Sequence, residues 1–322
     1  MENEDDQPPP PSPLPWREHQ VHDDGDGVDG AGDNTNFEWN MFQTQDDDDD
    51  GYEDVEFTYT VTDEEVETDS TVTLDITLRG QIEYPNSTGL ALWKASEVLA
   101  QFLCSSPNHV RSKRRQTAST VAAENPDGCV EQKHVLELGA GLGLCGIVAH
   151  RLGAQHVMLT DGDTEVLTNL KHNIERNVDN VDATRSISCS QLIWGRNLDE
   201  FSKKQQQIYK RERYDVILAS DLVYMTKSLE PLWQTIDRLL VRNGNETKSE
   251  YDTVGFVLFS WYCSSQCSME ALLDMATKYN FVWTRPRFNV KGGNDSIIDE
   301  EDDLSSSSIQ EGIYIFQRKV VV

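Results

Sequence analysis

Every second residue is apolar in two stretches, 55–61 and 72–78, which an acidic segment separates. A period of two residues is typical of a strand with one buried face. We therefore expect a β-hairpin within residues 52–80. Residues 86–103 (NSTGLALWKASEVLAQFL) repeat their apolar positions with a helical period instead, which predicts an amphipathic helix.

Beyond residue 133, short apolar runs alternate with amphipathic segments. Strands are expected at 135–138, 156–162, 186–194, within 214–224, and at 253–262, 281–288 and 312–319; helices are expected at 144–152, 165–176 and 229–240. Repeated strand–helix units predict a parallel sheet with helices on both faces, and the last two strands are expected to pair antiparallel. The predicted fold class is α/β: a Rossmann-like, seven-stranded sheet, mostly parallel with a reversed last strand, preceded by the hairpin and its helix. Ligands of such sheets bind at the carboxyl ends of the strands.

Three polar segments fall outside this pattern. Residues 1–51 are rich in Pro, Gly and Asp, and such a composition cannot bury enough apolar surface to offset chain entropy, so we expect a disordered acidic tail. Residues 105–133 are expected to form a surface insertion, and residues 289–311 an acidic, Ser-rich loop. The remainder of 52–322 is expected to be one domain.

The net charge of −28 is unevenly distributed along the chain. Residues 1–69 contain 24 of the 56 acidic residues and a single basic residue, Arg17. The tail therefore either docks a basic partner or only increases solubility, whereas the charge of the domain is close to balanced. A balanced domain disfavours a nucleic-acid partner, although the RSKRR run at 111–115 leaves two readings open, a nuclear-import or nucleic-acid patch and a solvated loop.

The six cysteines include no CxxC pair, and the histidines form no spaced cluster. We expect reduced thiols and no metal site, in the cytosol or the nucleus. The sequence also predicts neither a secretory signal nor a membrane-spanning helix.

Residues 134–146, HVLELGAGLGLCG, predict a ligand-binding turn between a strand and a helix. Gly141, Gly143 and Gly146 satisfy the GxGxxG pattern of dinucleotide-binding proteins, and Asp161 follows twenty residues after Gly141, where its carboxylate could accept hydrogen bonds from ribose hydroxyls. A dinucleotide and S-adenosylmethionine would use this carboxylate in the same way. The turn alone leaves both ligands open.

Glu137 favours one of the two. It stands two residues before Gly139 at the end of the first core strand, where its carboxylate would repel a pyrophosphate but tolerate the sulfonium and amino groups of S-adenosylmethionine. The extra glycine at 139 also allows the backbone to turn one step earlier than a dinucleotide requires. The alternative is that Glu137 caps nearby backbone amides.

Five motifs occur together in a fixed order: TGLALW at 88–93, ELGAGLG at 137–143, Asp161, LIWG at 192–195 and SDLVY at 220–224. In this combination the chain, from about residue 85 to 240, resembles methyltransferase family 16, the seven-β-strand methyltransferase-like proteins that mostly modify lysine side chains of other proteins. The resemblance implies a methyltransferase sheet and S-adenosylmethionine as the cofactor.

The resemblance also implies residue roles at the cofactor site. Backbone amides of the turn would approach the methionine moiety, Asp161 would bind the ribose, and Trp194 would lie near the adenine unless it is a core aromatic. Trp93 would either line the same pocket or pack from the predicted helix into the core of the protein. Ser220, where the family more usually has alanine, would contact the cofactor through its backbone. The implied cofactor-binding residues are Trp93, Glu137, Gly139, Ala140, Gly141, Asp161, Trp194 and Ser220.

Asp221 and Tyr224 fit the acid-x-x-aromatic motif of this family and are the implied catalytic residues. Methyl transfer is an in-line displacement, so an attacking lysine nitrogen has to be neutral and aimed at the methyl group. Asp221 would hold the incoming amine or remove its proton, and Tyr224 would shape the channel. The alternative is that Asp221 caps the following helix and Tyr224 packs. Trp261 and Tyr262 either form an aromatic wall around the lysine or belong to the core.

The sequence therefore favours an S-adenosylmethionine-dependent methyltransferase, and lysine of a protein substrate is the expected acceptor. We expect the protein to act as a monomer and not to associate with a membrane. Protein arginine or histidine, or a small molecule, stays open as the acceptor. A non-catalytic binding module on the same fold is a second alternative, and a nicotinamide oxidoreductase is a third, which Glu137 and SDLVY disfavour.

Overall fold

The computed structural model describes residues 51–61, 72–81, 87–105, 130–178, 184–223, 225–242, 255–261, 267–286 and 312–319. The expected tail before residue 51, most of the expected insertion at 105–133 and the expected loop at 289–311 lie outside the described residues.

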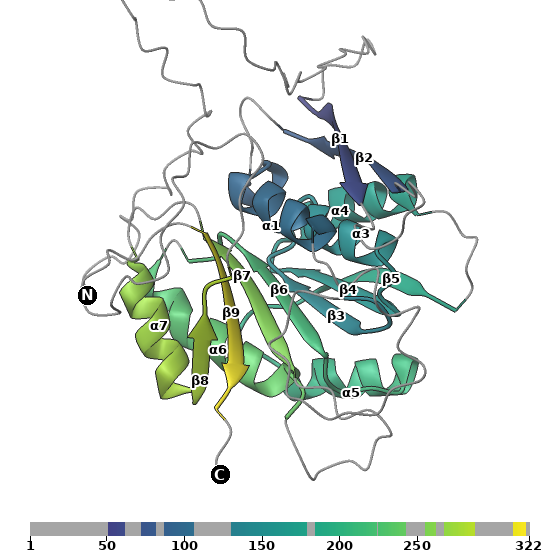
Figure 1. Cartoon of the computed structure of the whole chain (residues 1–322). Helices are drawn as coiled ribbons and strands as arrows, with labels where there is room; N and C mark the ends of the chain where they lie inside the picture. The colour runs from purple at the N-terminus through teal and green to yellow at the C-terminus, as the bar shows by residue number, and fades with distance from the viewer. Residues whose placement is uncertain are drawn as a thin grey trace, which may run out of the picture.

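A seven-stranded sheet forms the centre of the molecule (Figure 1). Its strands are β3 (His134–Leu138), β4 (His156–Asp161), β5 (Ser186–Gln191), β6 (Val216–Ser220), β7 (Phe256–Trp261), β8 (Phe281–Thr284) and β9 (Gly312–Arg318). They are ordered β5-β4-β3-β6-β7-β9-β8, and β9 runs antiparallel to both of its neighbours while β3 to β7 pair in parallel. This topology confirms the predicted fold class, including the antiparallel pair at the end.

Helices cover both faces of the sheet, which explains why strands such as β3 are buried along their whole length. One face carries α1 (Lys94–Ser105), α3 (Leu144–Arg151) and α4 (Thr164–Asn177); the other carries α5 (Leu198–Tyr209), α6 (Leu229–Leu239), the short η2 (Thr226–Ser228) before it, and α7 (Met269–Lys278). Side chains alternate between two apolar cores along the central strands, as Val135 and Leu136 do on β3. No helix in the described part of the chain is long and apolar enough to cross a membrane.

The helix predicted for 86–103 begins later than expected, and this part of the prediction was wrong. A single 3-10 turn, η1 (Thr88–Leu90), comes first, and α1 starts only at Lys94. Gly89 in this turn packs against Val166 of α4 so closely that a Cβ would approach Val166 to 2.7 Å, and Ala91 after the turn has extended backbone. The strand predicted for 186–194 likewise ends at Gln191, and α5 and α7 were not predicted.

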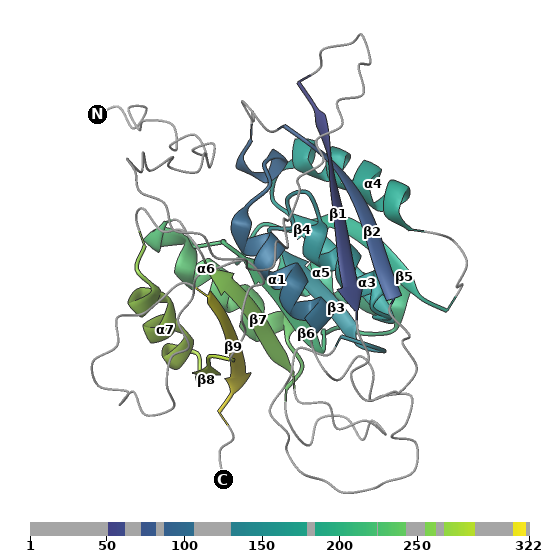
Figure 2. The ribbon, with the colours of Figure 1, turned by 45° about the horizontal axis from the view of Figure 1, so that its top comes forward.

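The predicted hairpin is present as β1 (Glu53–Val61) and β2 (Val72–Gly80), which pair antiparallel from Glu53↔Gly80 to Val61↔Val72. It lies outside the layer formed by α1, α3 and α4 (Figure 2). Its alternating pattern places Tyr59, Leu74, Ile76 and Leu78 against these helices, where all four are buried.

Candidate active site

The sequence-predicted residues gather where the strand order reverses. The chain passes from β3 outward to β4 and β5, then crosses back to β6, which pairs with β3 on its other side. In open α/β sheets this switch point leaves a crevice at the carboxyl ends of the two central strands. Here the two ends are Leu138, followed by the glycine turn, and Ser220, followed by Asp221.

The turn after β3 has left-handed backbone at three alternate residues: φ is 57° at Gly139, 52° at Gly141 and 88° at Gly143. Side chains other than hydrogen are disfavoured at such angles, which explains the repeated glycines. The turn is closed by hydrogen bonds from Ala140 N to Thr160 O (2.9 Å) and from Gly143 N to Ala140 O (2.8 Å). Gly143 is the N-cap of α3, so the turn delivers the backbone directly into a helix N-terminus.

Trp194 and Leu222, which belong to two different loops, both pack against the glycine turn. A Cβ on Gly139 would lie 2.5 Å from Leu222 Cδ2 and 3.5 Å from Trp194 Cζ2. Trp194 follows β5 and is half-buried, whereas Leu222 follows β6 and is buried. The structure thus brings the LIWG and SDLVY motifs together at Gly139. Leu222 was not predicted as a site residue, although it lies within the motif that was singled out.

Asp161 ends β4 beside the same turn. Its Oδ2 accepts a hydrogen bond from Gly141 N (3.2 Å), and its Oδ1 accepts one from Asp163 N (3.1 Å). Burial raises the pKa of this carboxyl, and the backbone amides of Asp163 and Gly141 oppose the increase. The carboxyl group is therefore fixed in orientation at the strand end.

Glu137 points away from solvent and is 1 % exposed. One carboxyl oxygen, Oε2, accepts a hydrogen bond from Gly146 N (2.8 Å) in the first turn of α3. Burial raises its pKa to about 8, although the Gly146 amide and the Cys145 thiol act in the opposite direction. The geometry matches the alternative in which Glu137 caps backbone amides; its contact with a cofactor stays a prediction.

Trp93 lies before α1 and not on it, which corrects the helical placement expected from the sequence. Its indole Nε1 donates to Thr88 O (2.9 Å), and the Trp93 carbonyl accepts hydrogen bonds from the backbone and hydroxyl of Ser96. This arrangement closes the loop that packs on the glycine turn, where Gly89 O would lie 3.1 Å from a Cβ on Gly141.

The predicted catalytic end of the site begins at Ser220. This residue is half-buried, and its side chain opposes the effect of burial, which raises the pKa of the buried Cys145 thiol. Asp221 has left-handed backbone (φ 53°), and its amide donates to Ser260 O of β7 (2.9 Å). Tyr224 and Tyr262 lie outside the described residues. Trp261 ends β7 and packs against the core on the α6 face.

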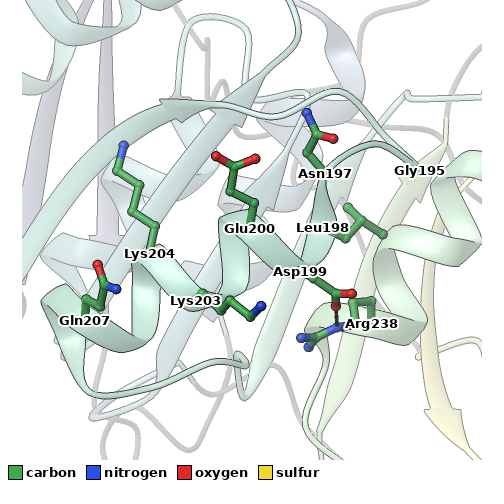
Figure 3. A pocket seen from close by; sticks show the side chains of 9 residues that line it. All are labelled: Gly195, Asn197, Leu198, Asp199, Glu200, Lys203, Lys204, Gln207 and Arg238. Atoms are coloured by element: carbon green, nitrogen blue, oxygen red, sulfur yellow. Dashed lines mark hydrogen bonds and ion pairs between the residues drawn. The ribbon is translucent and has the colours of Figure 1, made fainter.

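A concavity of about 950 Å³ lies beside this edge, along α5 (Figure 3). It meets the predicted site only at Gly195, the neighbour of Trp194. Its walls mix both signs of charge, and Asp199 is already paired with Arg238 at 2.7 Å. Gly139, Asp161 and Asp221 do not line it.

Comparisons with known proteins agree with this arrangement. A model of the lysine methyltransferase family matches residues 73–249. The chain is 33 % identical over 176 residues to the protein N-lysine methyltransferase METTL21A of Mus musculus. This alignment covers 50 % of this chain and 75 % of the relative.

Two further relatives are similar over shorter shares of their length. The chain is 32 % identical over 133 residues to the protein N-terminal and lysine N-methyltransferase EFM7 of Cryptococcus neoformans, covering 41 % of this chain and 43 % of the relative. It is also 32 % identical over 158 residues to a calmodulin-lysine N-methyltransferase of Arabidopsis thaliana, covering 48 % and 42 %. The chain thus spans less than half the length of these two proteins.

The matched region contains the hairpin strand β2 from its second residue, the glycine turn and the strands from β3 to β6. It includes every residue that the sequence assigned to the cofactor and to catalysis. S-adenosylmethionine is accordingly the cofactor of this methyltransferase class. The chain belongs to the lysine methyltransferase family, as the resemblance in its motifs predicted.

Proposed function

We propose that the protein transfers a methyl group from S-adenosylmethionine to a lysine side chain of another protein. The observation that carries this proposal is the meeting of three motifs at one edge of the sheet. Gly139 lies against Trp194 and Leu222, and Asp161 is hydrogen-bonded to Gly141. Membership in the lysine methyltransferase family supports the same reaction.

The residues at this edge fit the cofactor. Asp161 holds its carboxyl oxygens between two backbone amides, an orientation from which it would accept hydrogen bonds from the ribose hydroxyls. The half-buried Trp194 ring would pack against the adenine, with Trp93 lining the same pocket. Gly139 and Gly141 adopt the left-handed backbone that shapes the turn, and in this shape the backbone of residues 139–141 would approach the methionine moiety. Glu137 would act from beneath the turn, and Ser220 through its backbone.

Bound in this way, S-adenosylmethionine supplies an electrophilic methyl group on its sulfonium. The acceptor nitrogen has to be neutral and aligned with that group, a requirement that the protein itself must meet. We assign this task to Asp221, which follows β6 directly across from the glycine turn. Its carboxylate would hold the incoming amine and accept its proton, directly or through water. Tyr224 retains its proposed role as a wall of the lysine channel.

The acceptor could also be a protein N-terminus. The name of the relative EFM7 includes N-terminal methylation. An α-amine and a lysine amine require the same deprotonation and alignment, so Asp221 would serve both. Arginine, histidine or a small molecule as the acceptor, and a binding module without transfer, remain the alternatives to be separated by experiment.

The first test is calorimetric titration of the protein with S-adenosylhomocysteine. We expect micromolar binding by the wild type and at least a tenfold loss in Asp161→Ala, because two ribose hydrogen bonds to a charged group are worth about 1.5–3 kcal/mol each. Gly162→Ala is the matched control, since a Cβ at Gly162 would meet nothing within 4 Å. Absence of binding by the wild type would contradict the proposed function.

The second test follows methyl transfer itself. Cell extract is incubated with radiolabelled S-adenosylmethionine and the protein, and the labelled proteins are hydrolysed to identify the modified residue. We expect ε-methyllysine with the wild type, and a rate reduced about 100- to 10,000-fold with Asp221→Asn. Asparagine tolerates the left-handed backbone at this position, so the substitution removes the charge without straining the turn. Cofactor binding without any labelled product would favour the binding module.

A further inference from the structure

Helix α4 carries asparagines at positions 169, 173 and 177, four residues apart and therefore on one face. This face turns toward β2 of the hairpin, and the three side chains are 5 %, 0 % and 5 % exposed. A buried stripe of amides is costly unless the amides are hydrogen-bonded. Their partners show what the stripe holds together.

Asn173 is hydrogen-bonded to two separate segments. Its Oδ1 accepts from Arg79 N (2.8 Å) of β2, and its Nδ2 donates to Arg79 O (3.0 Å) and to Leu142 O (3.1 Å) of the glycine turn. The backbone amide of Arg79 can only donate, so the orientation of the carboxamide is unambiguous. The side-chain amide of Asn173 thus donates one hydrogen to the hairpin and the other to the glycine turn.

The side chains of the other two asparagines, Asn169 and Asn177, form no hydrogen bond to the glycine turn among the described residues. Asn177 pairs with the amide and carbonyl of Thr77 at 2.9 and 2.7 Å and also donates to Asn173 O, whereas Asn169 donates to Arg79 O at 2.7 Å. For these two, the bonds lead to β2 or stay within α4. Asn177 therefore provides a control within the same stripe.

The hairpin also touches the turn directly. A Cβ on Gly80, the last residue of β2, would lie 2.8 Å from Leu142 Cδ1, which leaves no space between the two. Leu142 itself lies between Gly141 and Gly143, two residues whose left-handed backbone most side chains do not favour. Its carbonyl is buried with the Asn173 amide, so the loss of that bond would leave an acceptor unsatisfied in the middle of the turn.

We propose that Asn173 is a positioning residue for the cofactor-binding turn, and that its shared amide couples the docking of the front hairpin to cofactor affinity. This inference rests on the proposed function, in which the turn binds S-adenosylmethionine. Coupling of this kind is reciprocal, so cofactor binding must also strengthen the attachment of β2.

The first experiment compares Asn173→Ala with Asn177→Ala in the full chain. We expect both substitutions to lower the melting temperature, because each removes a buried amide from the same stripe. Only Asn173→Ala should weaken S-adenosylhomocysteine binding, by about tenfold, the equivalent of one hydrogen bond of roughly 1.4 kcal/mol. In the transfer assay the same variant should raise KM for S-adenosylmethionine and leave kcat at saturation within about twofold. Equal affinities in the two variants would overturn the proposal.

The second experiment needs no substitution. Amide hydrogen exchange of the wild type is measured with and without S-adenosylhomocysteine, at the amides of Thr77 and Arg79. We expect the cofactor product to slow exchange at Arg79, which is bonded to Asn173. Unchanged exchange at Arg79 in protein that binds the ligand would refute the coupling and leave the proposed function intact. If the wild type does not bind the ligand at all, the proposed function fails first and the inference fails with it.

Discussion

Glu137 has a carboxyl group that is 1 % exposed and is kept from water beneath the glycine turn. Burial raises its pKa to about 8 in the folded chain, from an ordinary value of 4.5. Between these two values the folded protein retains a proton that the unfolded chain has lost. Folding is then coupled to proton uptake, so the stability that this group contributes is largest at low pH and decreases as the pH rises toward 8.

Replacing Glu137 by glutamine removes this pH dependence and preserves an oxygen that can accept from Gly146 N. We expect Glu137→Gln to equal the wild type in stability near pH 4.5 and to exceed it by a few kcal/mol at pH 7.5, in the absence of cofactor, because one pKa unit corresponds to about 1.4 kcal/mol. Urea unfolding at a series of pH values measures the difference. Burial also lowers the pKa of His156 to about 4, but its contribution is common to both proteins and cancels. If the stabilities of the wild type and Glu137→Gln changed with pH in the same way, Glu137 would be ionised in the folded state.

At the scale of elements, the glycine turn is the segment whose backbone the fold constrains most clearly. We expect Gly141→Ala to destabilise the protein by roughly 1–2 kcal/mol, because alanine at φ 52° is strained and its Cβ would lie 3.1 Å from Gly89 O. Binding of S-adenosylhomocysteine should weaken as well, since the displaced amide is the one bonded to Asp161. Gly162→Ala, one residue after Asp161 and in open space, should leave both quantities unchanged in thermal unfolding and titration.

The sequence predicted most elements because their apolar patterns were complete. Helix α7 was missed although its signal was present: Ser268 accepts from Ala271 N as an N-cap, and Met269, Leu272, Leu273 and Ala276 form the buried face. Helix α5 carried a weaker signal, because its buried residues are Phe201, Ser202 and Gln205 and two of these are polar. The start of α1 was misplaced because the helical pattern begins before it, whereas residues 88–90 form a separate 3-10 turn that packs on Val166 of α4 and is followed by the extended Ala91.

The candidate site was predicted to the extent that its motifs are contiguous in sequence. Asp161, Trp194 and Gly139 could be assigned from the motifs around them. The role of Asn173 could not, since it depends on segments about 30 and 94 residues away that only the tertiary structure brings together. The regular spacing of three asparagines on α4 was nevertheless a signal, because amides at i, i+4 and i+8 share one face of a helix.

For the molecule as a whole, ligand binding and folding are linked by mass action. S-adenosylhomocysteine at about 100 times its dissociation constant should stabilise the native state by about 2.7 kcal/mol and raise Tm by several degrees. Because Asn173 joins the turn to β2, the hairpin should melt with the sheet in the same transition, seen by both circular dichroism and exchange at Arg79. Asp161→Ala, with an affinity at least tenfold weaker, should be stabilised by at most about 1.4 kcal/mol at the same ligand concentration and should show a correspondingly smaller rise in Tm. Melting of the hairpin at a temperature well below the main transition would show that the hairpin and the sheet do not unfold together.

The place of β9 in the sheet has a consequence for synthesis of the chain. β9 lies between β7 and β8, yet it follows both in sequence. At a translation rate of about 5–20 residues per second, the segment from Thr284 to Gly312 takes on the order of seconds to emerge. During that interval β7 presents an unpaired edge, and the side chains that will contact Tyr314 and Phe316 have no partner. The nascent protein would therefore be prone to aggregation at this stage, and mutations that weaken β9 would prolong the exposure of this edge.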